Sequence, residues 1–182
     1  GLQCLKDKVS VYEELAAYLK KLDENLYEID RIVKTGNLMA DAILNSKLSL
    51  MREYQIRTEV TAHVPARMGL TDTELCVLLG NLLDNAIEAC RKVSREDNRF
   101  IKIYIDTLQE QFYISVMNGM EGRAIRRGEL FQSTKNGPGL HGFGLQRVDR
   151  IVEKYGGFLD RQSEEGVFAT EILLPVNFNS SN

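Results

Sequence analysis

Two asparagines and a glutamate in the middle of the chain are spaced so that they could act together on one ligand. Asn81, Asn85 and Glu88 are separated by four and three residues, so they share one face of a helix. An asparagine offers a neutral oxygen to a hard cation, and a phosphate-bound Mg²⁺ takes only one or two ligands from protein. Solvated amides on a helix surface would have the same spacing, so this helix alone leaves both interpretations open.

A second candidate is the segment GPGLHGFGL over residues 137–145. Glycines directly before a helix let backbone N–H groups approach a phosphate, whose charge the helix N-terminus favours. Glycines also punctuate ordinary loops, so this pattern is weak on its own. His141 could contact a phosphate or be a structural histidine, and Lys135 lies close enough to the glycines to add a positive charge.

The elements around these residues predict helices packed on one face of a mostly antiparallel sheet, an α+β sandwich. Thr71 and Glu74 form a capping box that begins a helix running to about Val93. The remaining predicted elements are strands 101–106 and 112–116, a long loop 118–144, a helix 145–155, and a hairpin that joins 158–161 to 168–174 through a turn at 164–166.

Apolar residues in the first third of the chain follow a heptad pattern between Tyr12 and Val33. Such a narrow stripe predicts a long, coiled-coil-like helix that needs a partner helix, from a second copy or from an antiparallel neighbour. A further helix is predicted over 38–54 and a strand over 56–64. We therefore expect a partial helical dimerisation stalk over residues 1–54 and a second domain over residues 55–182.

The composition indicates a folded chain and narrows its partners. The 182 residues carry a net charge of −3, which argues against nucleic acid as a partner. Three cysteines without metal or disulfide spacing are expected to be reduced. No stretch reaches the roughly 20 apolar residues of a membrane span. The chain begins at a glycine and enters helical sequence at once, so we expect a piece of a larger protein.

The order of the motifs resembles the GHKL ATPases, the superfamily of gyrase, Hsp90, histidine kinases and MutL. NLLDNAIEAC is similar to the N box, Asn118 to Gly122 stands at the first glycine box, and HGFGL is similar to the second. The residue sequences of these motifs are most similar to those of bacterial peptide-pheromone (quorum-sensing) sensor kinases. Over about residues 55–176 the resemblance implies a Bergerat fold that binds ATP with Mg²⁺ under a lid.

The resemblance also implies roles for single residues. Asn85 matches the Mg²⁺ ligand. Asn81 stands where ATP-hydrolysing relatives have a glutamate base that activates water. An amide cannot accept a proton at neutral pH, so Asn81 favours a kinase over an ATP-hydrolysing enzyme. The implied catalytic residues are Asn81 and Lys135, and the implied nucleotide-binding residues are Asn81, Asn85, Asn118, Gly122, Lys135, His141, Gly142, Phe143, Gly144 and Leu145.

The chain departs from the family pattern in three places. Asn118 replaces the aspartate that accepts a hydrogen bond from adenine, which predicts weaker adenine recognition. Met120 stands where the middle glycine of that box belongs. Glu88 stands where many histidine kinases place a basic residue, a charge that could come instead from Lys135 or from the loop arginines Arg126 and Arg127.

A histidine kinase needs a phosphoacceptor histidine on its stalk. The two histidines, His63 and His141, fall in a predicted strand and in the glycine-rich loop. We therefore expect the acceptor to lie upstream of this fragment, which would bind MgATP or MgADP without labelling itself. The expected context is a homodimer formed through the stalk, a response regulator as partner, a cytoplasmic location, and a membrane anchor in the missing N-terminal part.

Two other functions remain open at this stage. An anti-sigma-type protein-serine kinase shares the fold, although such relatives keep an acidic residue at the Asn81 position and lack a heptad stalk. A non-catalytic dimerisation module with a degenerate nucleotide pocket is the other, because the first glycine box is altered.

Overall fold

The computed structural model describes residues 32–124, 126–127, 130–131 and 143–175. The chain forms two compact units, Gly1–Ile32 and Val33–Asn182. The predicted coiled-coil-like helix falls almost entirely outside the described residues, so its structure stays a prediction.

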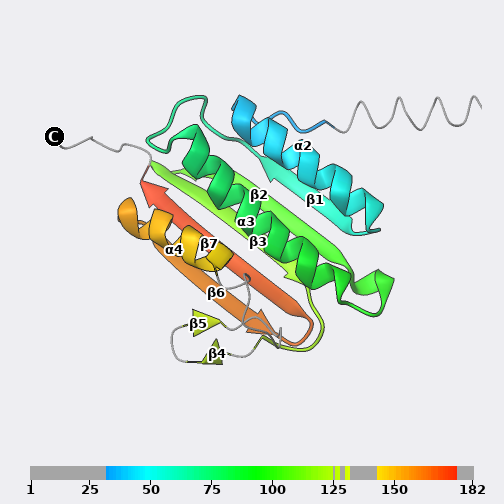
Figure 1. Ribbon diagram of the computed structural model, residues 1–182. Coiled ribbons are helices and arrows are strands. Elements are labelled where there is room, and N and C mark those ends of the chain that lie inside the picture. The colour runs from blue at the N-terminus through cyan, green and yellow to red at the C-terminus, as the bar shows by residue number, and fades with distance from the viewer. Residues whose placement is uncertain (1–31, 125, 128–129, 132–142, 176–182) are drawn as a thin grey trace, which may run out of the picture. The chain divides into compact units, whose positions relative to one another are not determined.

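Three helices and a five-stranded sheet build the second unit (Figure 1). The elements are α2 (Leu38–Glu53), β1 (Arg57–Ala62), α3 (Asp72–Arg91), the 3-10 turn η1 (Glu96–Asn98), β2 (Phe100–Leu108), β3 (Gln111–Gly119), β4 (Arg126–Arg127), β5 (Leu130–Phe131), α4 (Phe143–Lys154), β6 (Phe158–Glu164) and β7 (Val167–Pro175). The strand order is β1-β2-β3-β7-β6, and β4 pairs with β5 in a separate two-stranded sheet.

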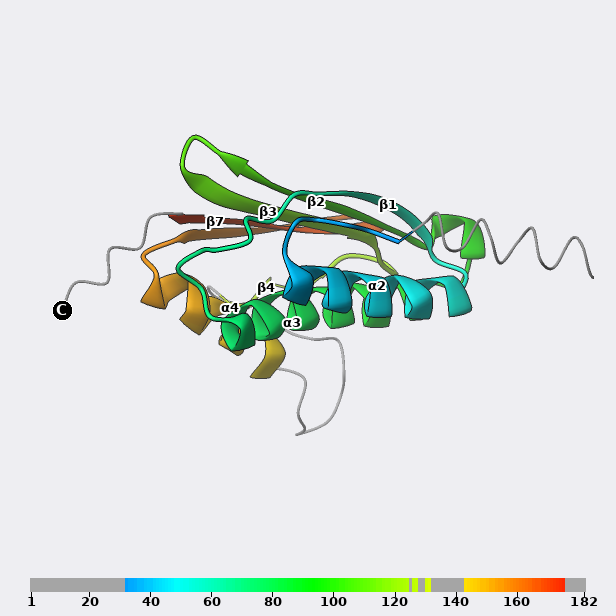
Figure 2. The ribbon, with the colours of Figure 1, turned by 90° about the horizontal axis from the view of Figure 1, so that it is seen from above.

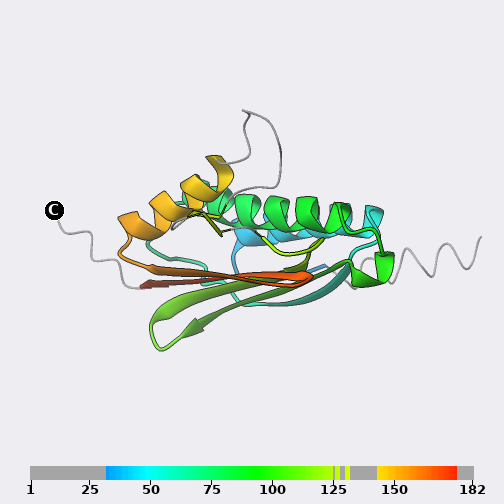
Figure 3. The same cartoon turned by 90° about the horizontal axis from the view of Figure 1, so that it is seen from below.

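All three helices lie on one face of the five-stranded sheet, as the edge-on views show (Figures 2 and 3). Four strands pair antiparallel, and β1 pairs parallel with β2. A parallel pair needs a crossover connection, which the α3 segment provides. The predicted α+β two-layer sandwich is confirmed.

The core lies between the two layers and is centred on α3. Eight α3 side chains are buried, all toward the sheet and the neighbouring helices: Leu75, Leu78, Leu79, Leu82, Leu83, Ala86, Ile87 and Cys90. They meet alternate residues of the strands, such as Ile103 on β2 and Ile114 on β3. Burying a leucine in this way contributes about 1.5–3 kcal/mol, so this face fixes the rotation of α3 and sends its polar residues outward.

The helix over 38–53 packs within the sandwich. Its buried residues Ala40, Leu44, Leu48 and Met51 belong to the same apolar cluster as α3. Asn37 caps the helix by accepting a hydrogen bond from the Ala40 N–H at 3.1 Å. The compact units accordingly divide after Ile32, whereas the sequence analysis placed residues 38–54 in the stalk, because an apolar face looks the same whether it packs on a partner helix or on a sheet layer. The identification of the two units as stalk and ATP-binding domain stays a prediction.

The long segment predicted as an irregular loop contains the short β4–β5 pair (Figure 1). Both strands of the first hairpin are also longer than predicted, since β2 extends to Leu108 and β3 to Gly119. Within the described part of the chain, no helix is both long and apolar enough to cross a membrane.

Candidate functional site

A complete capping box sets where α3 begins and so fixes the helical phase of its asparagines. The Thr71 hydroxyl accepts from the Glu74 N–H at 3.1 Å, and the Glu74 carboxylate accepts from the Thr71 N–H at 3.0 Å. The box was predicted and is confirmed. With the apolar face turned to the sheet, Asn81, Asn85 and Glu88 are half-buried on the other side of α3.

Asn81 lies directly against the start of α4. A Cβ atom added at Gly144 would stand 2.8 Å from the Asn81 Oδ1 atom, a distance that real Cβ contacts do not reach. The Asn81 Nδ2 group donates to the Val77 carbonyl at 2.6 Å, which holds the amide in place. The two candidate motifs therefore meet, since residues more than sixty positions apart touch where α3 and α4 lie side by side (Figure 1).

Asn85, one turn further along α3, has an unusual environment. Its Nδ2 atom is buried and has no hydrogen-bond partner among the residues that the structure describes. An unsatisfied buried donor costs about 1–3 kcal/mol. A polar ligand beside α3 would recover that cost, so the unpaired amide and the close approach of Gly144 to Asn81 fit a bound polar group at this place.

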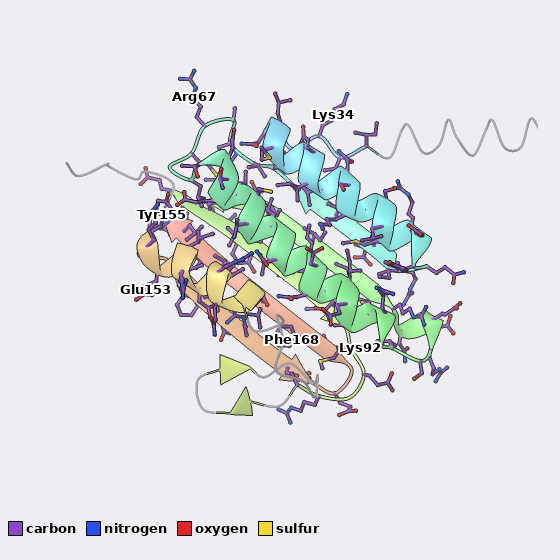
Figure 4. All side chains as sticks on the ribbon, viewed as in Figure 1. Lys34, Arg67, Lys92, Glu153, Tyr155 and Phe168 are labelled. Carbon is purple, nitrogen blue, oxygen red and sulfur yellow. The ribbon has the colours of Figure 1, made fainter. Side chains whose placement is uncertain are left out.

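Asn118 lies in the sheet beneath the helices, near the end of β3. It is buried, with 3% of its surface exposed, and its Nδ2 group donates to the Gly119 carbonyl at 2.9 Å. Its neighbours across the sheet are Ile101 on β2 and Phe168 on β7. Figure 4 shows Phe168 on the part of β7 that is seen between α3 and the start of α4. Because the amide nitrogen is bound to backbone, the carbonyl oxygen is the atom that can accept from a ligand.

Cys90 supports this end of β3, a role that the sequence analysis did not assign. Its sulfur lies 3.2 Å from the Phe100 carbonyl oxygen and 3.4 Å from the Gly119 carbonyl oxygen, and the two oxygens share its single S–H donor. Burial raises the pKa of the Cys90 thiol, so the thiol stays protonated and able to donate. Gly119 in turn packs so closely on η1 that an added Cβ atom would stand 2.2 Å from the Asn98 carbonyl oxygen.

Gly122 forms a turn that ties the segment after β3 to the β6–β7 hairpin. Its φ of +67° is a left-handed conformation that favours glycine. The Gly122 carbonyl accepts from the Gly166 N–H at 2.7 Å, and the Met120 N–H donates to the Gly166 carbonyl at 3.0 Å. This turn accounts for a glycine at 122 through backbone geometry, so its role toward a nucleotide stays a prediction.

The far end of α4 is fixed to the start of α3. The Glu74 carboxylate accepts from Lys154 Nζ at 2.5 Å and also from the Tyr155 hydroxyl; Figure 4 shows Tyr155 at this end of α4. Burial alone would raise the pKa of Glu74, but the hydrogen bonds from Lys154, Tyr155 and Thr71 outweigh it and lower the pKa to about 2. The capping glutamate thus also anchors the helix whose first turn carries Gly144.

The remaining predicted site residues are placed only in part. Lys135, His141 and Gly142 lie outside the described residues, as do the side chains of Phe143, Arg126 and Arg127. Gly144 and Leu145 lie in the first turn of α4 and are half-buried. Glu88 pairs with Lys92 at 3.5 Å, so the acidic residue at this position is compensated within α3.

Comparison with known proteins gives a consistent result. A protein-family model described as the GHKL domain matches residues 70–175. The protein named "Probable C4-dicarboxylate sensor kinase" of Halalkalibacterium halodurans is 28% identical over 168 residues, covering 87% of this chain and 31% of that protein. The sensor histidine kinase DpiB of Escherichia coli is 31% identical over 102 residues, covering 53% of this chain and 18% of that protein. This chain thus spans less than a third of the length of either relative.

Solved structures share the fold at low sequence identity. A catalytic domain of histidine kinase ThkA superposes with a TM-score of 0.57 at 20% identity, covering 76% of this chain and 92% of that one. Histidine kinase AdeS of Acinetobacter baumannii superposes with a TM-score of 0.55 at 13% identity, covering 95% of this chain and 84% of that one.

Proposed function

This chain belongs to the GHKL domain family, and from that premise we propose that it binds MgATP as the catalytic domain of a sensor histidine kinase. The γ-phosphoryl group would go to a histidine upstream of this fragment. The observation that supports the proposal most is the contact between Asn81 and Gly144, because it joins the N-box helix to the glycine-box helix. The relatives described above are named as sensor kinases, which fits this function.

The side chains that are present suit a nucleotide. When bound, MgATP would supply the phosphoryl group, and the metal would neutralise its charge. Asn85 would offer its carboxamide oxygen to the ion without adding negative charge. Its buried amide nitrogen, now unpaired, would gain an acceptor such as a phosphate oxygen. Asn118 would accept a hydrogen bond from the adenine amino group through its carbonyl oxygen.

The start of α4 would hold the phosphates. Its first backbone N–H groups have no acceptor within the helix, and the positive end of the helix dipole favours an anion there. In this proposal Gly142, Phe143, Gly144 and Leu145 contribute backbone donors, and Lys135 and His141 add polar contacts from the preceding segment. Gly122 would shape the first glycine box by its turn.

Asn81 favours phosphoryl transfer to a protein side chain over ATP hydrolysis. A carboxamide does not accept a proton at neutral pH, so it cannot act as the general base that activates water. Its nitrogen donates to the Val77 carbonyl, so its oxygen is turned toward Gly144 and the proposed phosphates. Asn81 would thus position groups rather than take a proton from water.

The whole protein is proposed to be a larger signalling receptor. Its parts would be a homodimeric stalk whose last stretch falls within residues 1–54, a cytoplasmic catalytic end, and a membrane anchor upstream. A response regulator would be the partner that receives the phosphoryl group. The NLLDNAIEAC and HGFGL segments support the peptide-pheromone subtype by resemblance, whereas one relative bears the name of a C4-dicarboxylate sensor kinase.

A thermal-shift titration with MgADP tests the binding function. A ligand at 100 times its Kd adds about 2.7 kcal/mol of stability, which would raise the melting temperature of the chain by several degrees. Asn85→Ala should lose most of that increase. If neither protein responds to MgADP, the non-catalytic dimerisation module is the better assignment.

Incubation with radiolabelled ATP tests the reaction. The chain alone should acquire no acid-labile phosphohistidine, whereas an added stalk fragment that carries the upstream histidine should acquire it. Acid-stable phosphoserine on a partner protein would instead identify the anti-sigma type of kinase.

A further inference from the structure

A cavity of about 530 Å³ lies along β6, where the segment after β3 passes that strand. Its lining is polar, and consists of Arg123, Ala124, Asp160, Arg161, Gln162, Ser163 and Glu164. β6 is an edge strand of the sheet. None of the proposed nucleotide-binding residues that the structure describes lines this cavity.

Arg161 is the buried group in the wall. Its side chain is 8% exposed, and its Nη2 atom donates to Asp149 on α4 at 2.5 Å. The Nε atom of the same guanidinium is buried without a hydrogen-bond partner in the part of the chain that the structure describes. A buried N–H without an acceptor costs about 1–3 kcal/mol. Asp149 therefore accepts from one edge of the guanidinium, and the Nε–H on its other edge has no oxygen acceptor.

Other contacts preform the wall beside Arg161. The Arg123 Nε atom donates to the Ser163 carbonyl at 3.1 Å, which holds an exposed guanidinium at the cavity. The Ala124 N–H donates to the Ser163 hydroxyl at 2.9 Å. The segment after β3 is thus fixed to β6 by two hydrogen bonds, and a second arginine lines the same cavity as Arg161.

The acidic residues of the lining point to the other side of the strand. Side chains alternate along a strand, so Asp160, Gln162 and Glu164 lie on the face opposite Arg161. The Gln162 amide donates to the Asp160 carboxylate at 2.8 Å, which confirms that these two share a face. On the side of the cavity that Arg161 forms, Asp149 balances one guanidinium, Arg123 adds an exposed positive charge, and the free Arg161 Nε–H is a donor.

We propose that this cavity binds a small oxyanion with the chemistry of phosphate. Arg161 donates to it through Nε while Asp149 holds the other edge of the guanidinium, and Arg123 adds a second positive charge. Arginine suits this task because its planar group presents several fixed donors and keeps its charge. The site shares no described residue with the contacts proposed for the nucleotide.

NMR of the ¹⁵N-labelled chain tests the proposal through the Nε–H resonances of its arginines. The Arg161 resonance is assigned as the one that is absent from the spectrum of Arg161→Lys. Inorganic phosphate should shift this resonance along a saturable curve. Arg161→Lys should bind phosphate at least tenfold more weakly. Arg150→Lys, the same change at an exposed position on α4, should bind phosphate as the unchanged chain does.

Asp149→Asn provides a second variant that retains Arg161. It removes the negative charge that compensates the guanidinium, so phosphate should bind more tightly. Weaker binding would contradict the assignment.

MgADP, titrated into the unchanged chain and into Asn85→Ala, identifies the source of the phosphate. A shift that needs Asn85 indicates a phosphate of the nucleotide, and a shift with inorganic phosphate in both proteins indicates the free anion. An Arg161 resonance that neither compound shifts along a saturable curve would show that the cavity holds water only.

Discussion

The carboxamide oxygen of Asn81 lies against the α-carbon of Gly144, so closely that a methyl group added there would stand 2.8 Å from it. The contact joins the middle of α3 to the first turn of α4. It fixes how far the glycine-box backbone lies from the asparagines of the N box.

Gly144→Ala should therefore weaken nucleotide binding. The added Cβ atom must displace either the Asn81 amide or the start of α4, and we expect the Kd for MgADP to rise about tenfold, or about 1.4 kcal/mol. Gly80→Ala is the matched control, since nothing lies within 4 Å of its added Cβ atom. That control should raise stability by about 0.5–1 kcal/mol and leave the Kd unchanged. Equal affinities of the two variants for MgADP, measured by calorimetry, would contradict this account of the contact.

Asn85→Ala should separate stability from binding. It removes a buried donor that has no partner within the described residues, so the free energy of unfolding without ligand should not fall and can rise by up to about 1–3 kcal/mol. Asn45→Ala is the comparison, because Asn45 accepts from the Val33 N–H and donates to the Val33 and Asp41 carbonyls. Losing those bonds should cost about 1–3 kcal/mol. Urea unfolding without nucleotide measures both, and a larger loss in Asn85→Ala than in Asn45→Ala would refute the idea.

Glu74 should make the stability of the domain depend on acid. Its pKa falls from 4.5 to about 2 on folding, so its contribution is fully present above pH 4.5 and is lost as the pH falls toward 2. Urea unfolding of the chain and of Glu74→Gln between pH 5 and pH 2 measures the difference. The difference in stability between the two proteins should narrow as the pH falls. A difference that stays constant would argue against the hydrogen bonds from Lys154 and Tyr155 to the Glu74 carboxylate.

The two cysteines of α3 should differ in reactivity. Cys76 is exposed and Cys90 is buried, where its raised pKa leaves little thiolate. In a Cys4→Ser background, a thiol reagent should modify Cys76 quickly and Cys90 only after unfolding. Cys90→Ala should also lower stability by about 1–2 kcal/mol, since the buried S–H donor that two backbone carbonyls share is lost. Rapid modification of Cys90 in the folded chain would contradict its burial.

Local signals in the sequence were sufficient to predict most elements. The capping box predicted the start of α3, and alternating apolar residues predicted the strands of both hairpins. The meeting of α3 and α4 could be expected only from the family resemblance, because spacing along the chain carries no distance between motifs that a long loop separates.

The features that the sequence did not predict depend on tertiary contacts. Helix α2 has the same apolar stripe whether it packs on a partner stalk or on α3. The unpaired nitrogen of Asn85, the thiol of Cys90 that braces Gly119, and the cavity at Arg161 depend on which groups lie opposite. Residue type and spacing do not specify those neighbours.

The most direct test of the central claim replaces Mg²⁺ by paramagnetic Mn²⁺ in a complex with ADP and follows the ¹⁵N spectrum of the chain. Signals near the ion broaden, so the Asn85 carboxamide and the Gly144 backbone amide should disappear together at substoichiometric Mn²⁺. The Asn45 carboxamide, held by Val33 and Asp41 on α2, should stay sharp. Signals of Asn85 and Gly144 that remain as sharp as that of Asn45 would contradict a nucleotide bound between α3 and α4.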